Sequence, residues 1–185
     1  MSTSEDWKNQ PPYGGFDVEK ISQAEWSGGC HCGSVKYEIY KKKPLDAKFC
    51  HCTTCQKMHG APFQWAAIFD KNDIRFLNGA ANLRFYNTKE RVQDHMLPCK
   101  VFCSTCLSPL MDEGRRMCML LPSTIDFAGK EQDRPLFAPT CHIEYENRSV
   151  GLRDGRPQYP GLNGQSEPVC EEEASKAPGT IPLFK

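Results

Sequence analysis

Seven of the eleven cysteines in this chain fall into three short motifs whose spacing suits the binding of metal ions. The motifs are Gly29-Cys30-His31-Cys32-Gly33, Cys50-His51-Cys52-Thr53-Thr54-Cys55 and Cys103-Ser104-Thr105-Cys106. Alternate residues of an extended strand point to the same side, so Cys30 and Cys32 can reach one ion together. The two-residue gap of the third motif allows a tight turn that brings both sulfurs to one ion. The middle motif places three thiols within six residues, which requires a turn.

Zinc is the metal that clustered thiolates of this kind favour. Four ligands from the first and third motifs would close a structural site, whereas three ligands from the middle motif would leave a fourth position open. A zinc ion with three protein ligands and an open position is typical of a catalytic site. Spacing alone also allows a zinc-ribbon pairing of Cys52 and Cys55 with Cys103 and Cys106. The 47 residues between those pairs exceed the roughly 15–20 that are usual in a ribbon.

Composition excludes several classes of protein. The 185 residues carry 23 basic and 23 acidic side chains, and this balance argues against broad electrostatic binding to nucleic acid or to an anionic membrane. No apolar run is long enough to span a bilayer, and residues 1–15 contain no apolar secretory segment. An odd number of cysteines cannot pair completely, and in a reducing compartment clustered cysteines more often hold metal than form disulfides. We therefore expect an intracellular metalloprotein, cytoplasmic, with the nucleus left open.

The elements that must position these motifs are predicted to be short strands, so the expected fold class is all-β. No window of helical length carries a sustained 3.6-residue period. Alternating or apolar runs predict strands at 34–40, 62–69, 74–76, 83–85, 95–102, 117–121 and 140–145. We expect a polar N-terminal arm at residues 1–22, a zinc-binding domain at 23–160 and a C-terminal tail at 161–185.

The histidines near the motifs have different expected roles. His31 and His51 alternate with ligand cysteines, so their side chains are expected to point away from the metal, at the surface or behind the ligands. His59 follows Cys55 closely and is the best candidate for an extra ligand or a proton shuttle. His95 and His142 lie in strand-like segments and are expected to be structural.

The remaining residues of interest leave two alternatives open. Cys99, Cys118 and Cys141 lie among apolar residues and are expected to pack in the core. Alternatively, the middle motif holds a second structural zinc that a histidine or Cys99 closes. Phe63 and Trp65 follow the middle motif closely and could either line a substrate pocket or fill the core.

The three motifs, in this order, resemble those of the glutathione-dependent formaldehyde-activating enzyme family, which also includes centromere protein V. The resemblance rests on GGCHCGSVKYEI, CHCTTCQKMHGAPFQW and FCSTC. It implies a β-tent fold of small antiparallel sheets and two zinc ions. The implied structural zinc is held by Cys30, Cys32, Cys103 and Cys106. The implied catalytic zinc is held by Cys50, Cys52 and Cys55. The chain departs from the family pattern at Leu107, where members usually carry glycine.

The activity that the resemblance implies is the condensation of glutathione with formaldehyde to S-(hydroxymethyl)glutathione, which is a carbon–sulfur lyase reaction in reverse. An open zinc position can bind a substrate thiol and lower its pKa, and the thiolate is the competent nucleophile. We predict a carbon–sulfur lyase acting on glutathione or its adduct, in which Cys50, Cys52 and Cys55 are ligands rather than attacking nucleophiles.

Two other classes of function remain as alternatives. One is a non-catalytic, zinc-stabilised module that binds protein or chromatin, and the other is a thiol redox or metal-transfer protein. The neutral charge and the lack of a long basic arm favour the enzyme over the chromatin binder.

Overall fold

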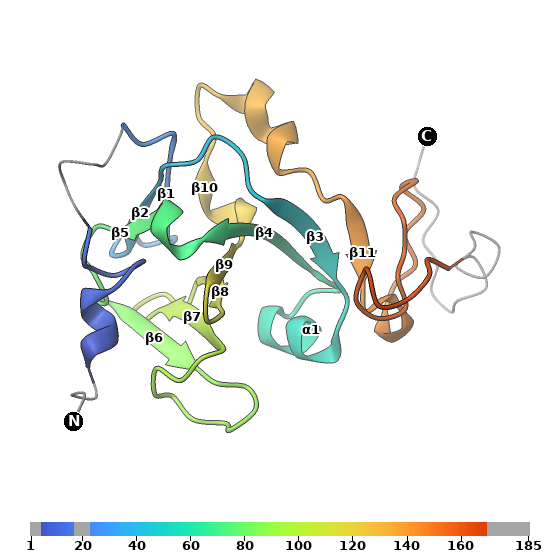
Figure 1. The fold of residues 1–185 in the computed structure, drawn as a ribbon, viewed down its shortest axis with the longest axis horizontal. Coiled ribbons are helices and arrows are strands. Elements are labelled where there is room, and N and C mark those ends of the chain that lie inside the picture. The colour runs from blue at the N-terminus through green and yellow to red at the C-terminus, as the bar shows by residue number, and fades with distance from the viewer. Residues whose placement is uncertain (1–4, 17–22, 170–185) are drawn as a thin grey trace. The chain divides into compact units, whose positions relative to one another are not determined.

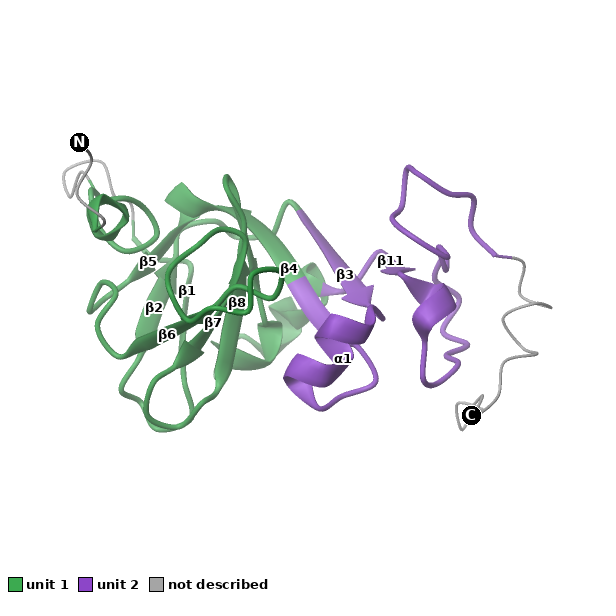
Figure 2. Ribbon diagram, turned by 90° about the horizontal axis from the view of Figure 1, so that it is seen from below, with its two compact units in different colours: residues 1–45, 67–137 green, residues 46–66, 138–185 purple. Residues whose placement is uncertain are grey.

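The computed structural model describes residues 5–16 and 23–169, which form two compact units (Figure 2). Unit 1 comprises Met1–Leu45 and Ala67–Phe137, and unit 2 comprises Asp46–Ala66 and Ala138–Lys185. Each unit therefore combines two separate segments of the chain. The predicted division into arm, domain and tail stays a prediction, and most of the tail, with Cys170, lies outside the described residues.

The first sheet of unit 1 carries the motif of Cys30 and Cys32 on the connection between two of its strands. It has four strands in the order β10-β1-β2-β5, all antiparallel to their neighbours. Their bounds are Trp26–Gly29 for β1, Lys36–Ile39 for β2, Ile74–Phe76 for β5 and Ile125–Asp126 for β10. The predicted alternation is confirmed here, because Val35, Tyr37 and Ile39 are buried and Lys36 is exposed.

A glycine is required where β1 passes Tyr37. A Cβ atom on Gly28 would lie 2.4 Å from the Tyr37 ring and 2.6 Å from the carbonyl oxygen of Thr124. The Tyr37 hydroxyl is 2.8 Å from the Thr124 hydroxyl, which fixes the ring against β1. The small residue therefore allows a large buried aromatic to lie directly against the neighbouring strand.

Five further strands of unit 1 lie in the order β4-β9-β8-β7-β6, again antiparallel. Their bounds are Gln64–Asp70, Met117–Leu120, Pro109–Glu113, Cys99–Cys103 and Leu83–Tyr86, respectively. Strand β4 begins with unit 2 residues and continues into unit 1 (Figure 2). Strand β7 ends at Cys103, so this sheet delivers the third cysteine motif.

The described part of the predicted polar arm packs on unit 1. Its 3-10 helix η1 (Asp6–Asn9) places Trp7 in a stack with His95, with ring centroids 3.7 Å apart. Tyr13 is 5% exposed and stacks on Phe76. The sequence shows no helical period in this segment because two aromatic anchors, rather than a continuous apolar face, hold it in place.

Unit 2 is built around a parallel pair of strands, β3 (Asp46–Cys50) and β11 (Cys141–Ile143), and the short helix α1 (Thr53–His59). Gly60 ends α1 in the left-handed conformation, with φ 58°. The remaining 3-10 helices of the described chain are η3 (Lys71–Asp73), η4 (Pro122–Thr124), η5 (Glu131–Phe137) and η6 (Tyr145–Asn147).

The expected fold class is confirmed at the coarse level, because the described residues form eleven strands and one α-helix. Figure 1 draws the strands as arrows and the helix as a coiled ribbon. Every predicted strand is present; β5 has the predicted ends, and the other strands have shifted ends. The expectation of no helix is wrong for α1, whose seven residues are too few to display a helical period. None of the helices in the described part of the chain has the length and apolar content needed to cross a bilayer.

Candidate metal centres

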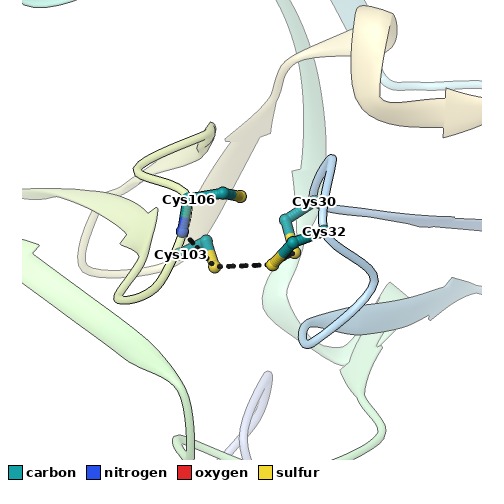
Figure 3. A group of neighbouring side chains, drawn as sticks. All are labelled: Cys30, Cys32, Cys103 and Cys106. Atoms are coloured by element: carbon teal, nitrogen blue, oxygen red, sulfur yellow. Dashed lines mark hydrogen bonds between the residues drawn. The ribbon is translucent and has the colours of Figure 1, made fainter.

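The four thiols of the first and third motifs converge in unit 1. Figure 3 shows Cys30 and Cys32 approaching from one loop and Cys103 and Cys106 from another. The sulfurs of Cys30 and Cys32 are 3.5 Å apart, and those of Cys32 and Cys103 are 3.8 Å apart. All four sulfurs lie within 4.8 Å of one another. We call this group the four-thiol cluster.

Backbone amides orient the sulfurs of this cluster. The amides of Thr105 and Cys106 both donate to the sulfur of Cys103, each at 3.4 Å, as a tight turn after β7 requires. The Val35 amide donates to the sulfur of Cys30 at 3.3 Å. Leu107 completes the turn in the left-handed conformation, with φ 60°. Leu107 thus has a backbone geometry that favours glycine.

Hydroxyl and amide donors favour the thiolate forms that a metal needs. The Ser108 hydroxyl lies 3.1 Å from the sulfur of Cys106 and, with the Ser108 amide, lowers the pKa of that thiol to about 5. Burial alone would raise the pKa of Cys30, but hydrogen bonds from Val35 and Ser34 outweigh it and lower the pKa. Hydrogen bonds from Ser34 alone would lower the pKa of Cys32, but the neighbouring Cys30 and Cys106 thiols and burial outweigh them and raise it. Two thiols of the cluster are therefore prepared for a cation.

The three thiols of the middle motif form a second group, in unit 2, which we call the three-thiol cluster. Cys50 ends β3, Cys52 is the N-cap of α1 and Cys55 lies in the first turn of the helix. The Cys55 amide donates to the sulfur of Cys52 at 3.3 Å. The three sulfurs lie within 4.8 Å of one another, and no other described His, Cys, Asp or Glu joins this group.

The crowding of these thiols disfavours a full set of thiolates without a cation. The neighbouring Cys52 thiol, with a contribution from burial, raises the pKa of Cys50 to about 11. Two anionic sulfurs this close repel each other, and a bound divalent cation removes that repulsion. The donor set therefore suits a soft or borderline metal ion rather than three free thiols.

Two buried histidines lie behind the middle motif. Nε2 of His51 is 2.9 Å from Nδ1 of His142, and Nε2 of His142 is 3.1 Å from Oδ1 of Asp154. Both histidines are fully buried. Burial, with His142 and Arg148 nearby, lowers the pKa of His51 to about 3, so its ring is neutral at physiological pH. Burial also lowers the pKa of His142.

Arg156 keeps the carboxylate at the end of this chain of hydrogen bonds ionised. Its guanidinium donates to Asp154 at 2.5 Å, and its amide donates at 3.1 Å. Burial alone would raise the pKa of Asp154, but these donors and His142 outweigh it and lower the pKa. An acceptor-only carboxylate therefore faces His142.

Aromatic rings surround the chain segment that carries the three-thiol cluster. Phe49 contacts Phe63 and Trp65, with centroids 4.7 and 6.5 Å apart, and the His51 ring lies 5.2 Å from Phe63. Both Phe63 and Trp65 are only partly buried. They thus pack on the core and retain exposed surface.

A third group of possible ligands, in unit 1, is occupied by hydrogen bonds. Glu113 is 1% exposed and receives donors from Tyr13, Lys71 and His95 at 2.7, 2.5 and 2.8 Å. Cys99 lies 3.9 Å from the same carboxylate. The ammonium group of Lys71 already balances the charge, so this cluster does not need a metal.

The other predicted residues are placed as follows. His31 is exposed and His51 is buried, and neither joins a thiol cluster. His59 is also absent from the three-thiol cluster, as is Cys99, which lies in unit 1. The core positions predicted for Cys99, Cys118 and Cys141 are confirmed, because all three are buried.

Sequence reasoning missed the partnership of His142 with Asp154 and His51. His142 lies 91 residues after His51 along the chain. The only local signal was Asp154-Gly155-Arg156, a turn in which the carboxylate and the guanidinium lie close together. Nothing in that tripeptide identifies a histidine twelve residues earlier as its partner.

Two known proteins resemble part of this chain. A protein of Halomonas elongata, provisionally named a glutathione-dependent formaldehyde-activating enzyme, is 27% identical over 84 residues. That alignment covers 45% of this chain and 52% of the relative, so the chain spans about half the length of the curated relative. A crystal structure of a Rhodobacter sphaeroides protein is 27% identical and has a TM-score of 0.42, covering 53% of this chain and 85% of that chain.

The family comparison covers the larger part of the chain. The model of the family described as glutathione-dependent formaldehyde-activating enzyme matches residues 25–147, which lie inside the predicted zinc-binding domain and include all seven motif cysteines. This chain therefore belongs to the glutathione-dependent formaldehyde-activating enzyme family.

Proposed function

We propose that this protein is a zinc-dependent carbon–sulfur lyase that makes and breaks the bond between glutathione and formaldehyde. The observation that carries the proposal is the three-thiol cluster, in which no fourth potential ligand from the described residues accompanies Cys50, Cys52 and Cys55. Such a set leaves a coordination position for a substrate thiol. The family match supplies the substrate class.

The geometry of the thiols fits zinc. Zinc–sulfur bonds of about 2.3 Å in a tetrahedral site place sulfurs roughly 3.8 Å apart. The separations of 3.5 and 3.8 Å in the four-thiol cluster match that value. We assign this cluster to a structural zinc, held by Cys30, Cys32, Cys103 and Cys106, and the three-thiol cluster to the catalytic zinc.

Zinc in the three-thiol cluster would supply a positive centre that lowers the pKa of a thiol entering the open position. In the synthetic direction, the glutathione sulfur forms a bond to the carbonyl carbon of formaldehyde and the carbon–oxygen π bond breaks. The thiol proton ends on the new hydroxyl oxygen, so no oxidant or reductant is needed. The reverse reaction breaks the same carbon–sulfur bond and returns the proton to sulfur.

The residues of the chain have separate roles in this scheme. The three cysteine thiolates bind the ion, and their combined charge exceeds the charge of a divalent cation, which keeps the substrate thiolate nucleophilic. The amide of Cys55 orients the sulfur of Cys52. The partly exposed rings of Phe63 and Trp65 offer apolar surface that can shield the reacting sulfur from water.

Exchange spectroscopy tests the proposal, because glutathione and formaldehyde also combine spontaneously and the enzyme must accelerate both directions. The measurement is the exchange rate of ¹³C-formaldehyde between its hydrate and the glutathione adduct. The zinc-loaded chain is expected to raise this rate, and Cys52→Ser is expected to remove the increase. The matched control is Cys118→Ser, which removes a buried thiol outside both clusters.

Two results would contradict the proposal. One is no acceleration by the zinc-loaded chain, which would favour a non-catalytic module. The other is full zinc content and full acceleration in Cys52→Ser, which would remove that thiol from the set of ligands.

A further inference from the structure

The line of hydrogen bonds from Asp154 through His142 to His51 determines where each ring carries its proton. The Asp154 carboxylate only accepts, so Nε2 of a neutral His142 must carry the hydrogen that bridges the 3.1 Å gap. Nδ1 of His142 is then a bare acceptor. The hydrogen in the 2.9 Å contact between the rings therefore belongs to Nε2 of His51.

This assignment leaves Nδ1 of His51 without a proton. The same atom is buried and has no hydrogen-bond partner among the described residues. In the interior, a bare ring nitrogen without a donor costs less than an N–H group without an acceptor, so burial favours this tautomer. The ring itself packs edge-on against Tyr145, with centroids 4.9 Å apart.

The backbone of His51 is held from two further directions. Its amide donates to the carbonyl of Ile143 at 3.0 Å, which extends the pairing of β3 with β11. Its carbonyl accepts from Nε2 of Gln56 at 2.5 Å, and Gln56 belongs to α1. His51 is therefore hydrogen-bonded to β11 and α1 through its backbone and to His142 through its ring.

His51 is also the residue between Cys50 and Cys52. In an extended segment its ring points to the side opposite the two sulfurs, where it meets His142. Fixing the His51 ring and backbone consequently fixes the two adjacent Cα atoms, and with them the Cα–Cβ directions from which both thiols project. The ring acts from behind the cluster, without touching a ligand position.

We propose that Asp154 and His142 are positioning residues for the three-thiol cluster, which hold His51 in one ring orientation and one tautomer and thereby set the spacing of Cys50 and Cys52. This inference rests on the proposed function, because it assumes that these thiols bind the ion. Partners behind metal ligands typically contribute 10–100-fold to metal affinity.

Two substitutions of one residue separate the two hydrogen bonds of His142. In His142→Asn an amide oxygen can occupy the place of Nδ1 and accept from His51, although the link to Asp154 is lost. In His142→Gln the amide reaches toward Asp154 but places a carbon where His51 needs an acceptor. The inference expects His142→Asn to retain more of the site than His142→Gln.

The readout is cobalt binding by the full chain, with glutathione added after the metal. An increase in the thiolate-to-cobalt charge-transfer band on adding glutathione reports only a site with an open position. We expect roughly 10–100-fold weaker cobalt binding at that site in His142→Gln and in Asp154→Ala, with the four-thiol site unchanged. His95→Asn is the matched control, because it removes another histidine whose side chain is largely covered (6% exposed) and paired with a carboxylate, Glu113, in the other unit.

Nitrogen NMR of the unmodified chain tests the tautomer without any variant. The ¹⁵N shifts of His51 are expected to show a protonated Nε2 and a bare Nδ1. A proton on Nδ1 would overturn the inference, even if every variant failed to fold.

The outcomes of the cobalt experiment are distinguishable from a failure of the proposed function. If the unmodified chain shows no glutathione-dependent band, the proposed function fails and the inference fails with it. If the unmodified chain shows the band but His142→Gln and Asp154→Ala bind cobalt equally well, only the inference fails. Equal losses in His142→Gln, His142→Asn and His95→Asn would also overturn it, since a general loss of stability would then explain the result.

Discussion

Single thiols in this protein take their chemistry from the donors that surround them. The Ser108 hydroxyl and amide lower the pKa of Cys106 to about 5, whereas the adjacent Cys52 thiol raises the pKa of Cys50 to about 11. The two clusters would therefore bind a cation for different reasons. The four-thiol cluster offers stabilised thiolates at Cys30 and Cys106, and the three-thiol cluster offers at Cys50 a thiol that a cation must help to ionise.

Glu113 gives a prediction at the residue scale. Burial alone would raise its pKa, but donors from His95, Lys71 and Tyr13 lower it below the ordinary value of 4.5. A depressed carboxyl pKa stabilises the fold above the unfolded value, and that contribution is lost as the pH falls through the folded value. Glu113→Gln is therefore expected to destabilise the chain by about 3 kcal/mol at pH 7.

The difference in unfolding free energy between the unmodified chain and Glu113→Gln should shrink below pH 4.5, because protonation of Glu113 removes the same charge from the unmodified chain. Urea unfolding of both proteins at pH 7, 5, 4 and 3 measures it, and taking the difference cancels any metal loss that they share. A difference in unfolding free energy that stays constant across this range would contradict the assignment.

Leu107 gives a second prediction. Its φ of 60° is a conformation that costs a residue with a Cβ roughly 1–2 kcal/mol, and its side chain is 58% exposed, so little burial is at stake. Leu107→Gly should raise the free energy of unfolding by about 0.5 kcal/mol after the entropic cost of glycine. Urea unfolding checks this, with Leu107→Ala as a control that keeps the Cβ and should give no gain.

At the scale of elements, the close approach of Tyr37 to β1 limits the size of the side chain that the first sheet can accommodate at position 28. Gly28→Ala would place a methyl group 2.4 Å from the Tyr37 ring, between β1, β2 and β10. We expect a loss of about 1–3 kcal/mol of unfolding free energy. Gly161→Ala is the control, because its Cβ would meet nothing within 4 Å. Equal unfolding midpoints for the two variants would show that β1 can move away from Tyr37.

The elements also show why some of the structure could be predicted and some could not. Strand β2 was predictable because Tyr37 and Ile39 alternate with polar residues. Helix α1 and the pairing of β3 with β11 were not, because a seven-residue helix has no visible period and a parallel pair joins distant segments. The membership of the two clusters followed from spacing and the family resemblance. The hydrogen-bonded series Asp154, His142 and His51 could not be predicted, because it depends on contacts between residues far apart in the chain.

At the scale of the whole molecule, each of the two units contains one thiol cluster. The four-thiol cluster joins the connection between β1 and β2 to the turn after β7, so a metal held there would contribute directly to the stability of unit 1. The three-thiol cluster lies within one short segment of unit 2 and closes no long loop. Loss of metal should therefore affect the two units differently.

Cys103→Ser and Cys55→Ser test this difference. Cys103→Ser is expected to unfold unit 1, which amide hydrogen exchange would show as lost protection in β7 and β8. Cys55→Ser is expected to abolish acceleration of the formaldehyde exchange while leaving that protection in place. Equal loss of protection in both variants would remove the distinction between a structural and a catalytic site.

The most direct test of the central claim is a crystal structure of the metal-loaded chain soaked with glutathione, with anomalous scattering to identify the ions. The account predicts two zinc ions, one bound by Cys30, Cys32, Cys103 and Cys106, and the other bound by Cys50, Cys52, Cys55 and the sulfur of glutathione. A second ion whose fourth ligand is a side chain of the protein, or no ion at the three-thiol cluster, would contradict it.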